Sequence, residues 1–303
     1  MGGYWCARKI RMGQSQLERV VFMGSFNKNV VVFSLVIILA LPLAGLWYYK
    51  KTHPRYIAPL PPRPEVTVTI IPGWNLRQVA GYLVKLGFAS TTDDVYRLTG
   101  EPAYDYRRVA SVFPKIDDSR IVAEKPGYDS YEGYLAPETF RVFRDATLLD
   151  VLKKLVGQRE KEITEQMWAD IEKSGHSSYE ILTMASILEK EVQTPQDKAK
   201  VADILWRRLE KNWALQVDSS VHYVADRTGD VFTTEKERDI DSPWNTYKYP
   251  GLPLGPIANP GVESIKAAIY PEKNGYWYFL TGKDGMVYYG KTLEEHNANK
   301  RKL

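Results

Sequence analysis

The sequence ILTMASILEKEV occupies residues 181–192 and decides how the centre of the chain folds. Apolar side chains recur in it at the spacing of one face of an α-helix. The residues of that face are Ile181, Leu182, Ala185, Leu188 and Val192. Ser177 and Ser178 mark a helix start just upstream, so the pattern predicts a helix from about residue 178 to residue 192. Its apolar face is expected to pack on the rest of the fold.

Two glutamates, Glu189 and Glu191, lie near the C-terminal end of this helix, where the helix dipole disfavours negative charge. They lie about 80° to either side of the centre of the apolar face, so only one can face a given cleft. Glu189 lies over the small residues Ala185 and Ser186, which leave room for a ligand. The pair either forms a solvated boundary around Lys190 or contains a general acid, whose half-buried carboxyl would have a raised pKa. Spacing alone does not choose between these interpretations.

The sequence upstream predicts a small α+β module followed by a larger mixed domain. Residues 66–71 (VTVTII) alternate and are β-branched, which is typical of a strand. Residues 76–87 and 91–100 carry helical spacing or helix-start signals and predict two short helices. We assign residues 66–130 to this module and its connector, and residues 131–303 to a mixed α+β catalytic domain. Further helices are expected over about 145–174, 195–212 and 262–269. The predicted fold class is α+β.

Residues 29–49 form an apolar run of about 21 residues without a charged side chain, long enough to cross the hydrocarbon core of a bilayer. A Trp-Tyr-Tyr sequence closes the run, as is typical of a membrane interface. A cleaved signal peptide fits less well, because its apolar region is shorter. The sequence predicts a transmembrane helix at 29–49, a cytoplasmic segment at 1–28 and a proline-rich stalk at 50–65. The numbers of basic residues on the two flanks are nearly equal, so they do not decide which flank is cytoplasmic. The single cysteine, Cys6, weakly favours the N-terminal flank, because the cytosol is reducing.

Composition excludes several classes of function. The net charge of +4 is too small for a dedicated nucleic-acid-binding protein. One cysteine cannot form an internal disulfide or a cysteine-rich metal site, and four scattered histidines do not make a multi-histidine centre. The sequence contains no glycine-rich phosphate loop, no G-x-S-x-G elbow and no H-E-x-x-H motif. We therefore expect a mechanism that uses no metal and no cofactor.

Four motifs in a fixed order resemble those of the MltG-like (YceG-type) endolytic murein transglycosylases. They are ASILEKE, LQVDSSVHY about 27 residues later, WNTYKYPGLPLGPIANPG, and EEHN near the C-terminus. The segment EGYLAPETF is similar to the family sequence as well, and residues 66–87 resemble the family's LysM-like strand-and-helix module. The resemblance covers about residues 66–303. A family segment around a G-x-Y motif is missing, so the LysM-like module is expected to be truncated.

The resemblance implies an enzyme that cleaves the β-1,4 bond between N-acetylmuramic acid and N-acetylglucosamine within nascent glycan strands and leaves 1,6-anhydromuramic ends. Carried over by motif, the first glutamate of E-K-E is the general acid and base, here Glu189, and Glu191 is the fallback acid. The 6-hydroxyl of the muramoyl residue replaces water as the nucleophile, which explains how one carboxyl suffices. The resemblance also implies a single-pass anchor in the cytoplasmic (inner) membrane, a catalytic domain outside the cytoplasm, and proximity to peptidoglycan synthases.

Two of the motifs supply hydrogen-bonding groups suited to sugar hydroxyl and acetamido groups. The candidate substrate-binding residues are Gln216, Asp218, Ser219, Asn245, Thr246 and Tyr247. Asn and Thr in loops often bond the local backbone, so loop formation is the alternative role of Asn245 and Thr246. Glu132 and Glu138 are candidates for the cleft wall only.

Two other functions compete with this interpretation. The first is a non-catalytic glycan-binding or scaffold protein of the cell envelope, which the truncated module favours. The second is a pyridoxal-phosphate-dependent lyase, which is disfavoured because the sequence has no glycine-rich phosphate cradle.

Overall fold

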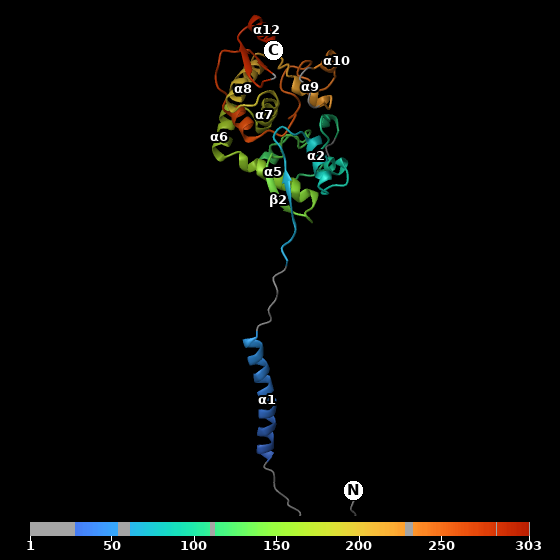
Figure 1. Cartoon of the computed structure of the whole chain (residues 1–303), viewed down its shortest axis with the longest axis vertical. Helices are drawn as coiled ribbons and strands as arrows, with labels where there is room; N and C mark the ends of the chain where they lie inside the picture. Colours follow the sequence, from blue (N-terminus) through green and yellow to red (C-terminus); the bar gives the residue numbers. More distant parts are fainter. Residues whose placement is uncertain (1–27, 54–60, 110–112, 228–232, 283, 303) are drawn as a thin grey trace, which may run out of the picture. The chain divides into compact units, whose positions relative to one another are not determined.

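The computed structural model describes residues 28–53, 61–109, 113–227, 233–282 and 284–302, with side chains described from residue 40 onward (Figure 1). The chain divides into two compact units, residues 1–62 and residues 63–303, and each is described by itself. The predicted cytoplasmic segment 1–28 lies almost wholly outside the described residues, as does much of the predicted stalk.

The first unit contains helix α1 (Lys28–Thr52), which takes in the apolar stretch 29–49. Within the part of the chain that the structure describes, no helix combines the length and the apolar character needed to cross a membrane. The side chains of residues 28–39 lie outside the described residues. The transmembrane helix therefore stays a prediction.

The second unit combines short strands with many helices, and this mixed content fits the predicted α+β class. Its strands are β1 (Glu65–Thr69), β2 (Thr139–Phe143), β3 (Tyr278–Thr281) and β4 (Val287–Gly290). Its helices are α2 (Leu76–Lys85), α3 (Thr92–Thr99), the 3₁₀ turn η1 (Tyr106–Arg108), α4 (Arg120–Ala123), α5 (Leu148–Glu162), α6 (Glu165–Ser174), α7 (Ser178–Glu191), α8 (Pro195–Glu210), α9 (Asp218–Val224), α10 (Glu235–Arg238), α11 (Val262–Ile269) and α12 (Leu293–Lys300).

This unit contains two antiparallel strand pairs, and the first of them connects distant parts of the chain. In the first sheet β1 pairs with β2, with Val66 opposite Val142 and Val68 opposite Phe140. In the second sheet β3 pairs with β4. Because β1 belongs to the predicted LysM-like module and β2 follows the EGYLAPETF segment, the sheet joins residues assigned to the module with residues assigned to the catalytic domain. Both lie in one compact unit, 63–303.

The helices around the E-K-E motif begin and end close to the predicted positions. Helix α7 starts after Ser177, whose side chain accepts a hydrogen bond from the backbone N–H of Glu180, while the Glu180 carboxylate accepts one from the backbone N–H of Ser177. The single helix expected over 145–174 is instead two helices, α5 and α6. The second helix, α6, begins after Thr164, whose hydroxyl accepts a hydrogen bond from the backbone N–H of Met167 at 3.2 Å and so caps the helix.

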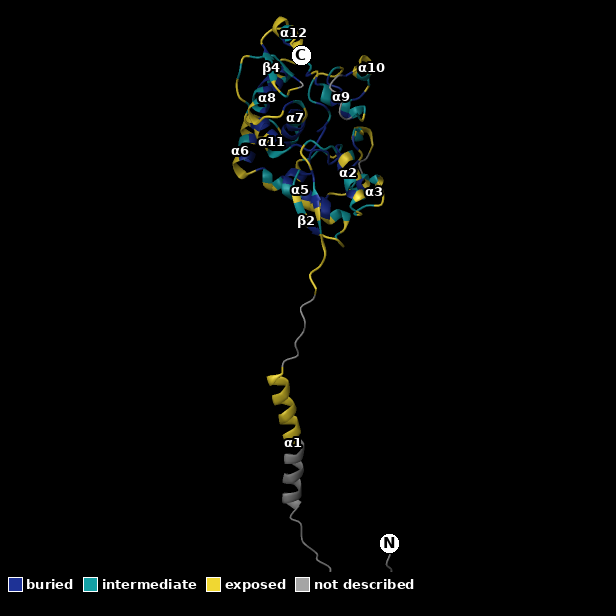
Figure 2. Cartoon of the chain, viewed as in Figure 1, coloured by how far each residue is buried: buried dark blue, intermediate teal, exposed yellow. Residues whose placement is uncertain are grey.

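Helix α7 is buried on all sides and not only on its apolar face. Every residue from Ile181 to Leu188 is buried, and the helix packs against α8, α9 and α11 (Figure 2). Its buried Ser186 satisfies its hydroxyl by donating to the Thr183 carbonyl at 2.7 Å and accepting the N–H of Ile257 at 3.0 Å. The core therefore fixes α7 firmly, and the two glutamates extend from its last turn.

Candidate active site

Glu189 lies in a buried ion pair at the end of α7. Its Oε2 accepts hydrogen bonds from the Lys198 ammonium at 3.1 Å, the Gly261 N–H at 3.0 Å and the Ser264 hydroxyl at 2.5 Å. Only 11% of its side chain is exposed. Burial alone would raise the pKa of Glu189, but Ser264, Lys198 and Gly261 outweigh it and hold the pKa of this carboxyl below its usual value. The raised pKa expected of a general acid at Glu189 is therefore contradicted.

Glu191 lies on the other flank of α7 and has the opposite electrostatic environment. Its Oε1 accepts a hydrogen bond from the Ser219 hydroxyl at 2.6 Å, and its backbone carbonyl accepts one from Thr281 at 2.9 Å. Burial raises the pKa of the Glu191 carboxyl above its usual value, the Ser219 hydroxyl opposes that rise, and the charge of Asp218 adds to it. Glu191 thus has the raised pKa that a general acid needs.

Two more of the predicted residues form a pair next to Glu191. The Tyr247 hydroxyl donates to Asp218 Oδ1 at 2.6 Å, and the Arg238 guanidinium lies over the Tyr247 ring at 5.1 Å. Burial raises the pKa of the Tyr247 hydroxyl, and its hydrogen bond to Asp218 raises it further. Asp218, Ser219 and Tyr247 therefore gather around Glu191 and not around Glu189.

Gln216 shapes the loop that carries Asp218 and Ser219. Its φ of 52° lies in the left-handed region, which costs a non-glycine residue about 1 kcal/mol or more. Its backbone N–H donates to the Thr246 carbonyl at 3.2 Å, and its side chain is exposed. The loop containing Gln216 is therefore joined directly to the loop containing Tyr247, while its side chain stays available to a ligand.

Asn245 and Thr246 use their side chains to build this loop. The Asn245 amide donates to the carbonyls of Arg238 and Ile240 at 2.8 Å each, and its Oδ1 accepts the Tyr247 N–H at 3.0 Å. Asn245 and Thr246 are each 1% exposed. The Thr246 hydroxyl accepts the Val217 N–H at 3.1 Å and bonds Ser220 at 2.9 Å. Asn245 has the local bonding that was the alternative to sugar contact, whereas Thr246 bonds residues 26 and 29 positions away and so joins two loops.

We predict that Asn245→Ala destabilises the fold by about 2–4 kcal/mol, because it removes three hydrogen bonds and leaves buried backbone groups unpaired. Equilibrium urea unfolding of the variant measures this loss. Asn297→Ala, at an exposed position of α12, is the matched control and should stay within about 0.5 kcal/mol of the parent. An equal stability of the two variants would contradict the loop-building role of Asn245.

The sequence did not reveal the role of Glu132. Its carboxylate accepts the N–H of Leu76 at 3.0 and 2.8 Å, at the start of α2, and the Asn259 amide lies 3.3 Å away. Burial raises the pKa of Glu132 to about 7, although the Leu76 N–H lowers it in part. Glu132 is 1% exposed and joins α2 to the loop before α11, so it is no part of an open cleft wall. Its contacts are long-range, which is why no local pattern predicted them.

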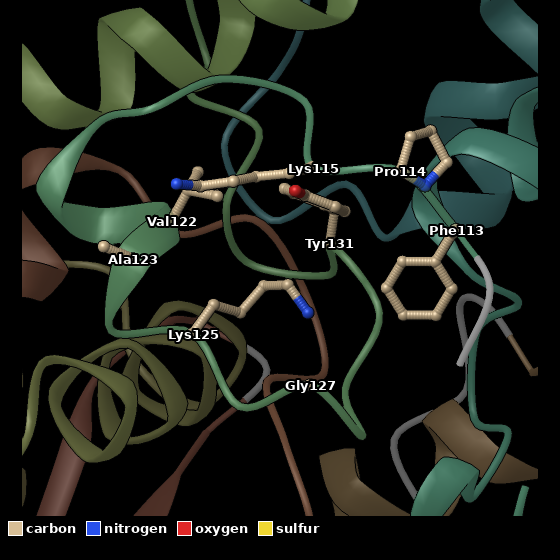
Figure 3. Close-up of a pocket in the computed structure, with 8 residues that line it drawn as sticks. All are labelled: Phe113, Pro114, Lys115, Val122, Ala123, Lys125, Gly127 and Tyr131. Atoms are coloured by element: carbon tan, nitrogen blue, oxygen red, sulfur yellow. The ribbon is translucent and has the colours of Figure 1, made fainter. Parts of the chain in front are cut away.

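A pocket of about 360 Å³ lies elsewhere in the unit and contains none of the candidate residues (Figure 3). It is lined by Phe113, Pro114, Lys115, Val122, Ala123, Lys125, Gly127 and Tyr131. The Lys125 ammonium lies 5.0 Å from the ring centres of both Phe113 and Tyr131 and donates to the Pro126 carbonyl at 3.0 Å. Across the described residues, no group of three or more His, Cys, Asp or Glu side chains could hold a metal ion.

Comparison with known proteins gives consistent matches. The model of the YceG-like family matches residues 51–302. An endolytic murein transglycosylase of Bacillus subtilis is 41% identical over 172 residues, which are 56% of this chain and 47% of that protein. One of Streptococcus pneumoniae (strain D39) is 26% identical over 241 residues, which are 77% of this chain and 44% of that protein. The chain thus spans about half the length of these curated relatives.

A solved structure agrees with the sequence match. The crystal structure of a yceG-like protein from Listeria monocytogenes is similar with a TM-score of 0.64 and 33% sequence identity. The similarity covers 82% of this chain and 79% of that one. With a family match that includes both the E-K-E helix and the loops that surround Glu191, the chain belongs to the YceG-like family.

Proposed function

We propose that this chain is a lytic transglycosylase that cuts the β-1,4 bond between N-acetylmuramic acid and N-acetylglucosamine within peptidoglycan strands, with Glu191 as its general acid and base. The observation that carries the proposal is the Glu191 carboxyl, whose pKa is raised by burial and which accepts a hydrogen bond from Ser219 beside the Asp218–Tyr247 pair. The names of the relatives, which describe endolytic cleavage of murein, support the same reaction.

The proposed reaction returns Glu191 to its starting state without consuming water. Protonated Glu191 donates its proton to the glycosidic oxygen while the bond to the muramoyl anomeric carbon breaks. The carboxylate that remains accepts the proton of the muramoyl 6-hydroxyl as that oxygen bonds to the same carbon. The nucleophile is part of the substrate, so its attack gains the advantage of an intramolecular reaction. The products are a 1,6-anhydromuramic end and a free hydroxyl on the neighbouring sugar.

The neighbours of Glu191 suit this chemistry. Ser219 donates to Oε1 of Glu191, and we assign the transfer of the proton to Oε2. The carboxylate of Asp218 is held by the Tyr247 hydroxyl, and its negative charge would stabilise the positive charge that develops on the sugar ring in the transition state. The exposed side chain of Gln216 is available for a sugar hydroxyl or acetamido group.

We predict that Asp218→Asn moves the alkaline limb of the pH–rate profile to lower pH. The charge of Asp218 helps to raise the pKa of Glu191, so its removal lowers that pKa. Activity requires protonated Glu191 and falls as the pH rises through this pKa, which means that the fall begins earlier in the variant. The measurement is kcat/KM against pH. The control variant Asp118→Asn changes an exposed carboxylate elsewhere and should leave the alkaline limb in place. An unmoved alkaline limb in Asp218→Asn would contradict the effect of the Asp218 charge on the pKa of Glu191.

We also propose that residues 29–49 anchor the enzyme in the cytoplasmic membrane, with residues 63–303 outside the cytoplasm. The length of the apolar run and its aromatic end support this proposal. Such an anchor would keep the catalytic unit close to newly made glycan strands and to the synthases that make them. Alkaline carbonate extraction of membranes, together with protease protection of intact spheroplasts, tests the anchor and its orientation.

The proposed function is tested with purified full-length protein and peptide-free glycan strands of known length. An endolytic enzyme shortens the whole length distribution early in the reaction, whereas removal of terminal disaccharides leaves the long strands almost intact. Tight binding of the strands with no change in their length would overturn the enzymatic proposal. That result would favour a non-catalytic glycan-binding protein of the cell envelope.

A further inference from the structure

Glu189 connects three elements that are distant in the sequence. Its one carboxylate oxygen receives the ammonium of Lys198 from α8 and the N–H of Gly261 and hydroxyl of Ser264 from the start of α11. Lys198 is 6% exposed and Ser264 is fully buried. This carboxylate therefore ties the last turn of α7 to α8 and α11 through charged hydrogen bonds in a site that contains little water.

The turn at residues 72–74 of the predicted module meets the same place. The Gly73 N–H donates to the Asn259 carbonyl at 2.9 Å, and the Asn259 N–H donates to the Trp74 carbonyl at 2.8 Å. Gly73 has a φ of 81°, and a Cβ built on it would lie 3.6 Å from Glu189 Cγ. The Lys190 ammonium lies 3.4 Å from the Gly73 carbonyl. The turn is thus hydrogen-bonded both to the loop before α11 and to the end of α7.

These contacts limit how the last turn of α7 can move. Glu189 and Glu191 leave the helix about 200° apart, so a rotation that frees one carboxyl necessarily displaces the other. Among the described residues, the Glu191 carboxyl is bonded by the hydroxyl and by the backbone of a single residue, Ser219. The three hydrogen bonds to Glu189 therefore set the position of the last turn of α7, and with it the position of the Glu191 carboxyl. Displacing a catalytic group by about 1 Å lowers the reaction rate greatly.

We propose that Glu189 is a positioning residue for Glu191. Its ionised carboxylate joins α7 to α8 and α11, and thereby holds Glu191 where the glycosidic oxygen must meet it. This assignment rests on the proposed function, because it presumes Glu191 as the acid. It also gives the module a supporting role in the active site through the turn at 72–74.

The test uses four full-length variants: Glu189→Gln, Lys198→Met, the double variant Glu189→Gln/Lys198→Met, and Glu191→Gln. Each single change at the ion pair leaves one buried group without its partner and is expected to lower the melting temperature, whereas the double variant removes both charges and should recover most of it. Activity is measured as kcat and KM on glycan strands, together with the pH–rate profile.

We expect kcat to fall at least tenfold in Glu189→Gln and to stay low in the double variant, while KM changes less than about threefold. We also expect Glu189→Gln to keep an alkaline limb in its pH profile, since Glu191 still supplies the proton. Recovery of wild-type kcat in the double variant along with its melting temperature would overturn the positioning role and leave Glu189 a purely stabilising one.

Failure of the proposed function gives a different result. If Glu191→Gln keeps a titrating limb and substantial kcat while Glu189→Gln has no activity at any pH, then Glu189 is the acid and both proposals fall. If the wild-type protein cleaves no strand at all, the enzymatic proposal falls, and the positioning role of Glu189 falls with it. If Glu189→Gln does not fold, the kcat, KM and pH–rate profile of the double variant are compared with those of the wild type instead.

Discussion

Replacing Glu191 with glutamine is expected to lower the rate of strand cleavage by about 10²–10⁴-fold, the usual contribution of a general acid. Glutamine keeps the size of the side chain and can still accept the hydroxyl of Ser219, so the fold should be retained. It cannot donate an acidic proton to the glycosidic oxygen. The rate is measured from the appearance of 1,6-anhydromuramic ends in the glycan strands, and the melting temperature shows whether the variant is folded.

A matched control separates this effect from a general loss of negative charge. Glu210→Gln changes an exposed glutamate at the end of α8 and should leave the rate within about twofold of the parent. Activity of Glu191→Gln within tenfold of the wild type would remove Glu191 from the mechanism. Glu189 would then be reconsidered, despite the ion pair that keeps its carboxyl ionised.

Replacing Gly133 with alanine is expected to destabilise the second unit by about 2–5 kcal/mol. Gly133 has a φ of 85°, in the left-handed region, and a Cβ at this position would lie 2.6 Å from Cβ of Pro256 and 2.7 Å from its Cγ. The strained backbone costs about 1–2 kcal/mol and the overlap with a rigid ring costs about 1–3 kcal/mol more. Urea or thermal unfolding of the full-length variant measures the loss.

Gly81→Ala is the control for this prediction. Gly81 lies inside α2, and a Cβ built there meets no atom within 4 Å. Alanine in a helix interior is more favourable than glycine by about 0.5–1 kcal/mol, so this variant should be slightly more stable. If Gly133→Ala were as stable as Gly81→Ala, the close packing of the Pro256 ring against the Gly133 backbone would be wrong.

The contact at Gly133 gives a physical reason for two of the sequence motifs. EGYLAPETF contributes Gly133, and GLPLGPIANPG contributes Pro256, which approaches where any side chain at Gly133 would be. Asn259, also in the second motif, accepts the N–H of Leu135 from the first at 2.9 Å. The two motifs are far apart in the chain, but they form one packed region that carries α11 and thus the partners of Glu189.

The sequence predicted what local rules determine. The capping residue Ser177 and the apolar spacing of 181–192 fixed the start and the length of α7 to within a residue or two. The same rules failed at Ile163, where the helical spacing continues but Thr164 starts a new helix. They also placed Glu189 and Glu191 on opposite flanks, where the structure has them bonded to different partners.

The choice between the two glutamates depends on contacts that are distant in the sequence. Lys198, Gly261 and Ser264 lower the pKa of Glu189, and none of them is marked by a pattern near residue 189. Ser219 and Asp218 were predicted as site residues, but nothing in their spacing assigned them to Glu191. The small residues beside Glu189 suggested room for a ligand, whereas the structure places the Lys198 ammonium and the Ser264 hydroxyl against this carboxyl.

Mass spectrometry of the cleavage products made in water enriched with heavy oxygen tests the central claim most directly. Transglycosylation with Glu191 as the only acid and base predicts muramic ends in the 1,6-anhydro form that contain no heavy oxygen, and about 10²–10⁴-fold slower formation of these ends by Glu191→Gln. Reducing muramic ends that carry heavy oxygen at the anomeric carbon would show that water is the nucleophile and would contradict the account.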